Sequence, residues 1–180
     1  MRHRFERLIK QSAFYFGGDQ PTVTGIERLR SGFGVLLGLF FVLAIARFLG
    51  QWAGVEEWLM ASLGASAVIV FAIPGSPMAQ PWAVIAGNTL SALIGIGCAN
   101  TIAQPILAMP IAATLSILSM FGLRCLHPPA AAVALIAVMG HIAQLRYAVF
   151  PVMIDSIILV LIGAIYSNLT GKRYPNRPIS

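Results

Sequence analysis

Long apolar runs, separated by short polar or proline-rich breaks, dominate the pattern of this chain. Apolar residues fill approximately positions 31–49, 58–73, 82–99, 105–123, 128–140 and 148–166. Because ~20 apolar residues in an α-helix cross the ~30 Å hydrocarbon layer of a membrane, these runs predict membrane helices. We therefore expect an all-α membrane protein with about six transmembrane helices. The second and fifth runs are short, so they predict short or broken helices.

Two parts of the chain resemble each other in the same order and at nearly the same spacing. Residues 65–73 align with 130–138 at a shift of 65, and residues 93–100 align with 161–168 at a shift of 68. A duplication would give two units of three helices, and an odd number of helices inserts the second unit upside down. Two inverted three-helix repeats with short helices at matching positions are typical of a central transport site.

Charge is scarce and lies at the two ends. Hydrophobic residues make up 58% of the sequence and charged residues only 10%, against about 25% in an ordinary soluble domain. The net charge of +6 comes from basic residues before the first run and after the last. This distribution predicts a multi-pass protein, most simply of a bacterial inner membrane, with both termini cytoplasmic and in contact with membrane lipid. Nucleic acid is not an expected partner.

The charge pattern also divides the chain. We expect a cytoplasmic N-terminal arm over residues 1–30, a transmembrane domain over 31–168 and a cytoplasmic tail over 169–180. Cys98 and Cys125 lie in apolar sequence and predict packing residues rather than a disulfide framework.

A cation and an imidazole stand beside a double proline in the stretch 123–132. Pro128 and Pro129 cannot continue a helix, but proline suits the first turn of a new one. The predicted helix 128–140 would therefore start beside His127 and Arg124, with free backbone N–H groups that favour an anion. Because Pro128 and Pro129 have no N–H, usable donors would begin at Ala130. Since His127 lies at a break, we expect its loss to affect flux more than folding.

These residues resemble the HPP family of integral membrane proteins, which is named for the triplet found here at 127–129. The resemblance extends to the segments 62–67, 74–81, 87–88 and 91–95, and covers roughly residues 30–170. Ala130 and Ala131 stand where many relatives have glycine. The resemblance implies a multi-pass membrane protein, with nitrite transport assigned to some members.

The repeat alignment places the segment 62–64 opposite 127–129, and residues 87–88 opposite 155–156, so the starts of the two short helices would converge. Small polar side chains there could offer neutral donors, although they also pack helices together. Asp155 would repel an anion unless it is paired, and we expect it to pair with Arg124 or a backbone donor, with proton coupling as the alternative. The predicted substrate-binding or permeation residues are His127, Arg124, Ser62, Gly64, Ser66, Asn88, Ser91, Pro128, Pro129 and Ala130.

Motifs for other chemistry are missing from the sequence. Paired carboxylates, a Gly-x-Ser-x-Gly elbow, a Walker loop and a His/Cys metal cluster are all absent, so an enzyme, a cofactor and a metal are not expected. The sequence predicts a transporter or channel for a small monovalent anion in a homo-oligomer, and the family resemblance implies that this anion is nitrite. A non-transporting scaffold or assembly protein is the alternative. A channel and a proton-coupled carrier are not separated by the sequence.

Overall fold

The computed structural model describes residues 23–53 and 60–176, and this part of the chain is helical without strands. Six α-helices are present in order, together with a short 3₁₀ turn and a π-helical stretch. Their bounds are α2 (Gly25–Ala53), α3 (Met60–Ala72), η1 (Pro77–Ala79), α4 (Pro81–Thr101), α5 (Pro105–Gly122), α6 (Ala130–Met139), η2 (Ala148–Met153) and α7 (Ile154–Leu169). The predicted all-α fold is confirmed.

Four of the described helical segments are long and apolar enough to cross a membrane. They are Gly25–Phe48, Pro81–Thr101, Pro105–Gly122 and the combined η2 and α7, Ala148–Leu169. Helices α3 and α6 are shorter, with 13 and 10 residues, as predicted for the second and fifth runs.

Two helix starts differ from the predicted ones. Helix α2 begins six residues before position 31, where the Thr24 hydroxyl accepts the backbone N–H of Glu27 and caps the first turn. Helix α6 begins at Ala130 rather than at Pro128, because the two prolines form a turn that precedes the helix. In that turn the N–H groups of residues 130, 131 and 132 donate to the carbonyls of residues 127, 128 and 129.

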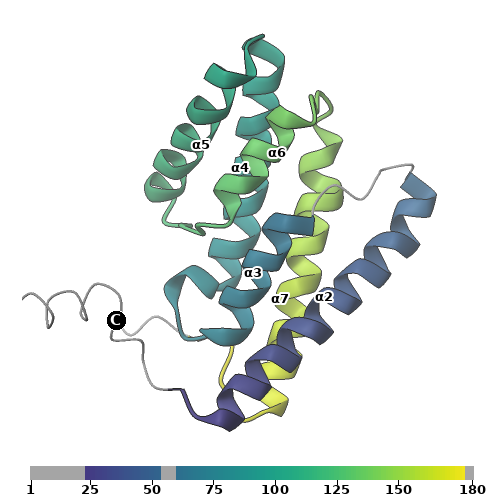
Figure 1. Ribbon diagram of the computed structural model, residues 1–180, viewed down its shortest axis with the longest axis vertical. Helices are drawn as coiled ribbons and strands as arrows, with labels where there is room; N and C mark the ends of the chain where they lie inside the picture. Colours follow the sequence, from purple (N-terminus) through teal and green to yellow (C-terminus); the bar gives the residue numbers. More distant parts are fainter. Residues whose placement is uncertain (1–22, 54–59, 177–180) are drawn as a thin grey trace, which may run out of the picture.

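The helices form two groups around two central ones, as Figure 1 shows. Helices α4 and α7 run along the long axis of the molecule. Helices α5 and α6 pack on one end of α4 and on each other, while α2 packs on α3 and α7. The loop from α5 to α6, residues 123–129, therefore lies about half way along the long axis (Figure 1).

Close packing depends on glycines where helices touch. Phe71 of α3 is fully buried, and its ring lies where side chains at Gly34 and Gly38 of α2 would be. On α4, a Cβ at Gly95 would come within 2.6 Å of the carbonyl oxygen of Ala134 on α6. Small residues that let backbones approach are the usual means of helix association in membranes.

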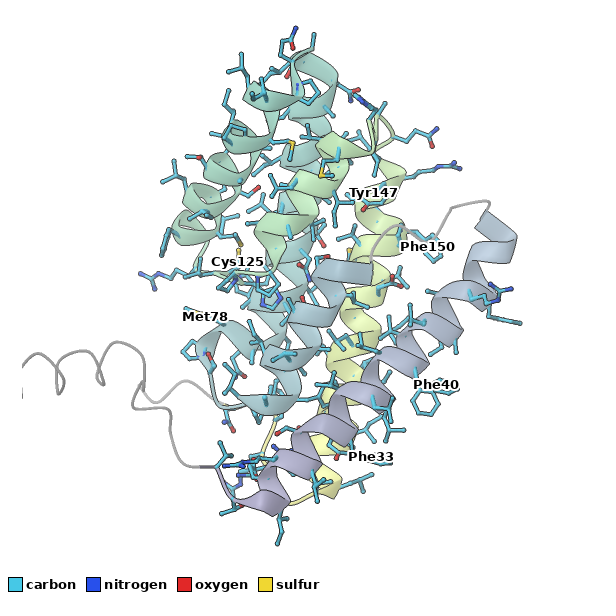
Figure 2. The ribbon with its side chains drawn as sticks, in the orientation of Figure 1. Phe33, Phe40, Met78, Cys125, Tyr147 and Phe150 are labelled. Atoms are coloured by element: carbon cyan, nitrogen blue, oxygen red, sulfur yellow. The ribbon has the colours of Figure 1, made fainter. Side chains whose placement is uncertain are left out.

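The outer faces of α2 and α5 are apolar. Phe33 and Phe40 of α2 project away from the bundle (Figure 2), and Ile106 and Leu118 of α5 are also more than half exposed. Such faces suit lipid tails or another copy of the chain.

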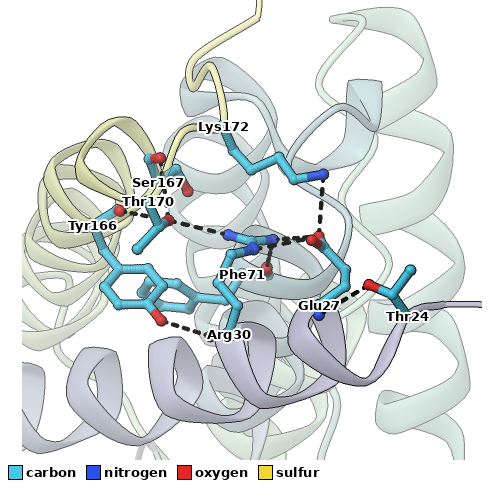
Figure 3. A network of polar contacts seen from close by, with 8 residues as sticks. All are labelled: Thr24, Glu27, Arg30, Phe71, Tyr166, Ser167, Thr170 and Lys172. Carbon is cyan, nitrogen blue, oxygen red and sulfur yellow. Dashed lines mark hydrogen bonds and ion pairs between the residues drawn. The ribbon is translucent and has the colours of Figure 1, made fainter.

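A network of polar contacts joins the start of α2 to the ends of α3 and α7 (Figure 3). Arg30 binds the carboxylate of Glu27 at 2.8 Å, and its guanidinium also donates to the carbonyl of Phe71 and the hydroxyl of Thr170. Lys172 lies 3.3 Å from the same Glu27 carboxylate. The start of the first described helix, α2, and the end of the last, α7, therefore lie on the same side of the molecule.

Candidate functional site

His127 is the centre of the candidate site, and it is fully buried. Its Nδ1 lies 2.8 Å from the carbonyl oxygen of Met78, and its Nε2 lies 2.8 Å from the hydroxyl of Ser66. Because a carbonyl only accepts, Nδ1 carries a proton and donates to Met78. The imidazole thus joins three segments: the α5–α6 loop, helix α3 and the η1 turn.

The Ser66 hydroxyl has two possible acceptors for its single proton. It lies 2.8 Å from His127 Nε2 and 3.0 Å from the carbonyl oxygen of Ser62. A neutral imidazole accepts the hydroxyl proton, whereas an imidazolium donates to the hydroxyl, which then donates to Ser62. Both protonation states of His127 are therefore satisfied without any movement of heavy atoms.

The turn that carries the Met78 carbonyl is fixed by two residues that follow the last helix, Tyr174 and Asn176. The Tyr174 hydroxyl, almost fully buried, donates to the carbonyl of Ala79 at 2.7 Å. The Gln80 amide donates to the carbonyls of Pro74 and Ser76 and accepts the backbone N–H of Asn176. Burial raises the pKa of the Tyr174 phenol, so the phenol keeps its proton and remains a donor.

Helix α4 presents one small-residue face to the loop that carries His127. A Cβ at Gly87 would lie 3.0 Å from both the Cys125 carbonyl oxygen and the His127 Cβ, so the backbone of α4 reaches the loop directly. Ser91 follows four residues later on the same face, and its hydroxyl is buried without a partner among the residues that the structure describes.

Asn88 connects this centre to α7. Its side-chain Nδ2 donates to the hydroxyl of Ser156 at 3.0 Å, and that hydroxyl donates to the carbonyl of Val152 at 2.8 Å. Since the Ser156 proton is used on Val152, the amide must donate to Ser156, and the Asn88 Oδ1 is left buried without a partner.

The structure brings only part of the predicted set together. Ser62, Ser66, His127, Pro129 and Ala130 are buried around the meeting of α3 and the α5–α6 loop, and Asn88 and Ser91 are buried on α4 beside them. Gly64 has open space where its side chain would be, so it faces away from these groups. Pro128 is exposed.

The backbone donors predicted at the start of α6 are already used. The N–H groups of residues 130–132 each donate to a carbonyl three residues earlier, so none points freely at a ligand. The carbonyls of residues 127–129 are the nearest acceptors to these N–H groups, so the hydrogen bonds form within the turn.

Arg124 and Asp155 do not form the predicted pair. Arg124 is exposed, with a left-handed φ of 52°, while Asp155 is buried in α7 and its Oδ1 has no partner among the described residues. The expectation was wrong because the helix break turns Arg124 outward while Asp155 faces the packed interior.

Sequence reasoning missed the residues that hold His127 from outside the motif. Met78 acts through its backbone carbonyl, which leaves no signal in the side-chain pattern. Tyr174 lies in the tail that we expected to be cytoplasmic and polar, and the only signal is an aromatic residue soon after the last apolar run.

The apolar helices and their buried polar centre define an all-helical integral membrane protein. Comparison with known families then identifies the kind: residues 20–175 match the profile described as HPP, transmembrane region, so the chain belongs to the HPP family. No solved structure matches this chain.

Two curated relatives come from Dictyostelium discoideum, and both are named only as transmembrane proteins. One is 37% identical over 142 residues, which cover 74% of this chain and 50% of the relative. The other is 36% identical over 126 residues, which cover 66% of this chain and 40% of the relative. The chain thus spans about half the length of these relatives or less.

Proposed function

We propose that this protein moves a small monovalent anion across a membrane, and that nitrite, which the family resemblance implies, is the first substrate to test. The observation that carries the proposal is the buried contact between His127, in the loop that leads into α6, and Ser66, in the middle of α3. A loop and a short helix that meet inside a membrane protein place polar groups where lipid offers none.

The arrangement of the helices supports an inverted repeat. Helix α2 packs on α3 and α7, and its counterpart α5 packs on α6 and α4, which are the counterparts of α3 and α7. Asn88 and Ser156, which the shift of 68 makes equivalent, bond to each other. Equivalent residues would meet in this way near a two-fold axis, so this bond supports an axis that passes between α4 and α7.

The donors for an anion would be side chains rather than helix N-termini. The Ser66 hydroxyl can rotate its proton from its present acceptor to a solute, and the His127 Nδ1–H would donate to a solute that replaces the Met78 carbonyl. Small solutes that lack donors of their own, such as nitrite, would accept from them, and the positive end of α6, which begins three residues after His127, would add ~0.3–1 kcal/mol. Arg124, on the surface, would serve as an edge cation.

A non-transporting scaffold is the second candidate, and the same centre favours it in one respect. Both ring nitrogens of His127 already have protein partners, as expected for a residue that only fixes three segments together. The exposed apolar faces of α2 and α5 would then serve assembly with further copies. We propose a homo-oligomer for either function, in a bacterial inner membrane with both termini cytoplasmic.

Flux measurements separate the two candidates. Purified protein is reconstituted into liposomes, and nitrite, nitrate, formate and bicarbonate are offered one at a time, with protein-free liposomes as the background. We expect nitrite entry above background, and entry that falls at least tenfold in His127→Ala. Correctly folded protein that passes none of the four anions would favour the scaffold.

A further inference from the structure

Asp155 lies beside the Asn88–Ser156 pair and has no evident role in the fold. Its side chain is 3% exposed, and its Oδ1 has no hydrogen-bond partner among the described residues. A buried carboxyl oxygen without a donor is unusual, because an ionised carboxylate in such a place is costly. The group therefore calls for a functional explanation.

The elements that pack against α7 bring no cation to this carboxyl. Helices α3 and α4 contain no Asp, Glu, Lys, Arg or His, and neither does η2. On α2, Glu27 and Arg30 bind each other at the far end of α7, near Thr170. Arg28 lies in the same turn of α2 as these two residues. Arg47 has an interaction of its own.

Tyr147 is the titratable neighbour. It lies just before η2, its hydroxyl is buried without a partner in the described part of the chain, and burial, together with Asp155 when that carboxyl is ionised, raises the pKa of Tyr147 to about 12. The phenol therefore keeps its proton. Because the described elements that pack on α7 place no cation beside it, the buried Asp155 carboxyl is more stable with a proton bound than as a carboxylate. Asp155 is therefore the group at this place that can bind and release a proton.

Two buried acceptors near the Asn88–Ser156 bond lack a donor among the described residues. They are Asn88 Oδ1 on α4 and Asp155 Oδ1, one residue before Ser156 on α7. The Asn88 amide cannot turn round, because its Nδ2 donates to Ser156. Acceptors repel a bare anion, so an anion that passes near Asp155 would be repelled unless the negative charge of Asp155 is cancelled.

We propose that Asp155 binds a proton during each passage and makes the anion flux electroneutral, an inference that rests on the proposed function. A carboxylate oxygen of Asp155 takes a proton from hydronium on one side, so that an O–H bond forms on Asp155, an O–H bond of hydronium breaks and water is left. The anion passes the neutral acid, and the proton returns to water on the other side. One negative and one positive charge cross together.

The test uses the full-length protein in liposomes that contain a pH-sensitive dye and are offered nitrite. We expect one proton to enter with each nitrite. A membrane potential of about 100 mV would change the accumulation of an uncompensated monovalent anion about 50-fold, and we expect the wild-type protein to show no such change. In Asp155→Asn, nitrite entry should continue without proton entry and become sensitive to the potential.

Glu27→Gln is the matched control, because it makes the same acid-to-amide change at the end of the bundle, and it should keep proton entry. If Asp155→Asn is inactive, Asp155→Glu decides: coupled flux in the Glu variant supports a proton site, and loss of flux there too overturns it. Wild-type nitrite flux without protons, or proton entry unchanged in Asp155→Asn, overturns this inference alone. The absence of wild-type nitrite flux overturns the proposed function, and this inference with it.

Discussion

Replacing His127 by alanine removes two buried hydrogen bonds at once. The Met78 carbonyl and the Ser66 hydroxyl lose their shared partner, and a buried polar group without a partner costs about 1–3 kcal/mol. We expect His127→Ala to unfold at a clearly lower temperature in detergent, measured by the loss of a monodisperse peak in size-exclusion chromatography after heating. His127→Gln, which can donate and accept, should recover part of the loss. Equal melting temperatures for wild type and His127→Ala would contradict this role.

This prediction differs from the expectation drawn from the sequence, in which a side chain at a helix break contributes little to folding. The double proline correctly indicated the break, and the structure buries the imidazole there with two hydrogen-bond partners. Its partners could not be predicted, because one is the backbone carbonyl of Met78, 49 residues earlier. Ser66 could be predicted as part of the site, since the repeat alignment brought the two short segments together.

At the scale of the elements, the contact between α4 and α6 offers a sharp test of packing. A Cβ at Gly95 would lie 2.6 Å from the Ala134 carbonyl oxygen and 2.8 Å from its Cα, and backbone atoms cannot move aside cheaply. We expect Gly95→Ala to destabilise the protein by about 1–3 kcal/mol, the usual cost of overpacking. The measurement is the midpoint of unfolding in a denaturing detergent such as SDS.

Gly97→Ala is the matched control, two residues along the same helix. Its new side chain would meet nothing within 4 Å, so it should be neutral or should stabilise α4 by roughly 0.5–1 kcal/mol through helix propensity. If the two variants unfold at the same midpoint, the close approach of α4 and α6 is not what holds this contact.

The helices themselves were largely predictable, because apolar length alone marks a segment that must satisfy its backbone inside a membrane. Their ends were less so. The start of α2 depends on the cap at Thr24, and the start of α6 depends on how the carbonyls around the two prolines are used. Local hydrogen bonds decide such boundaries, and apolar patterns do not report them.

At the scale of the whole molecule, the two ends of the described chain should be labelled from the same side. Arg30 reaches Thr170, so residues before α2 and after α7 lie together. We expect Val23→Cys and Arg173→Cys to react with the same impermeant maleimide, applied to inside-out vesicles, and Gln144→Cys to react only from the opposite side. Native Cys98 and Cys125 are buried, so their background should be low.

Labelling of Val23→Cys and Arg173→Cys from opposite sides would contradict the arrangement in Figure 1. Protection of Gln144→Cys from both sides would instead indicate that another subunit covers the turn between α6 and η2.

The network of Arg30, Glu27 and Lys172 also sets an order of events during synthesis. Helix α2 emerges from the ribosome first, but Thr170 and Lys172, which complete its ties, are made about 140 residues later. Before then, α2 can already pack on α3, through the Phe71 carbonyl and ring. The contacts of α2 are therefore completed by the last part of the chain. If synthesis stops before Thr170, α2 stays in the membrane without the Arg30–Thr170 hydrogen bond and without the Glu27–Lys172 ion pair.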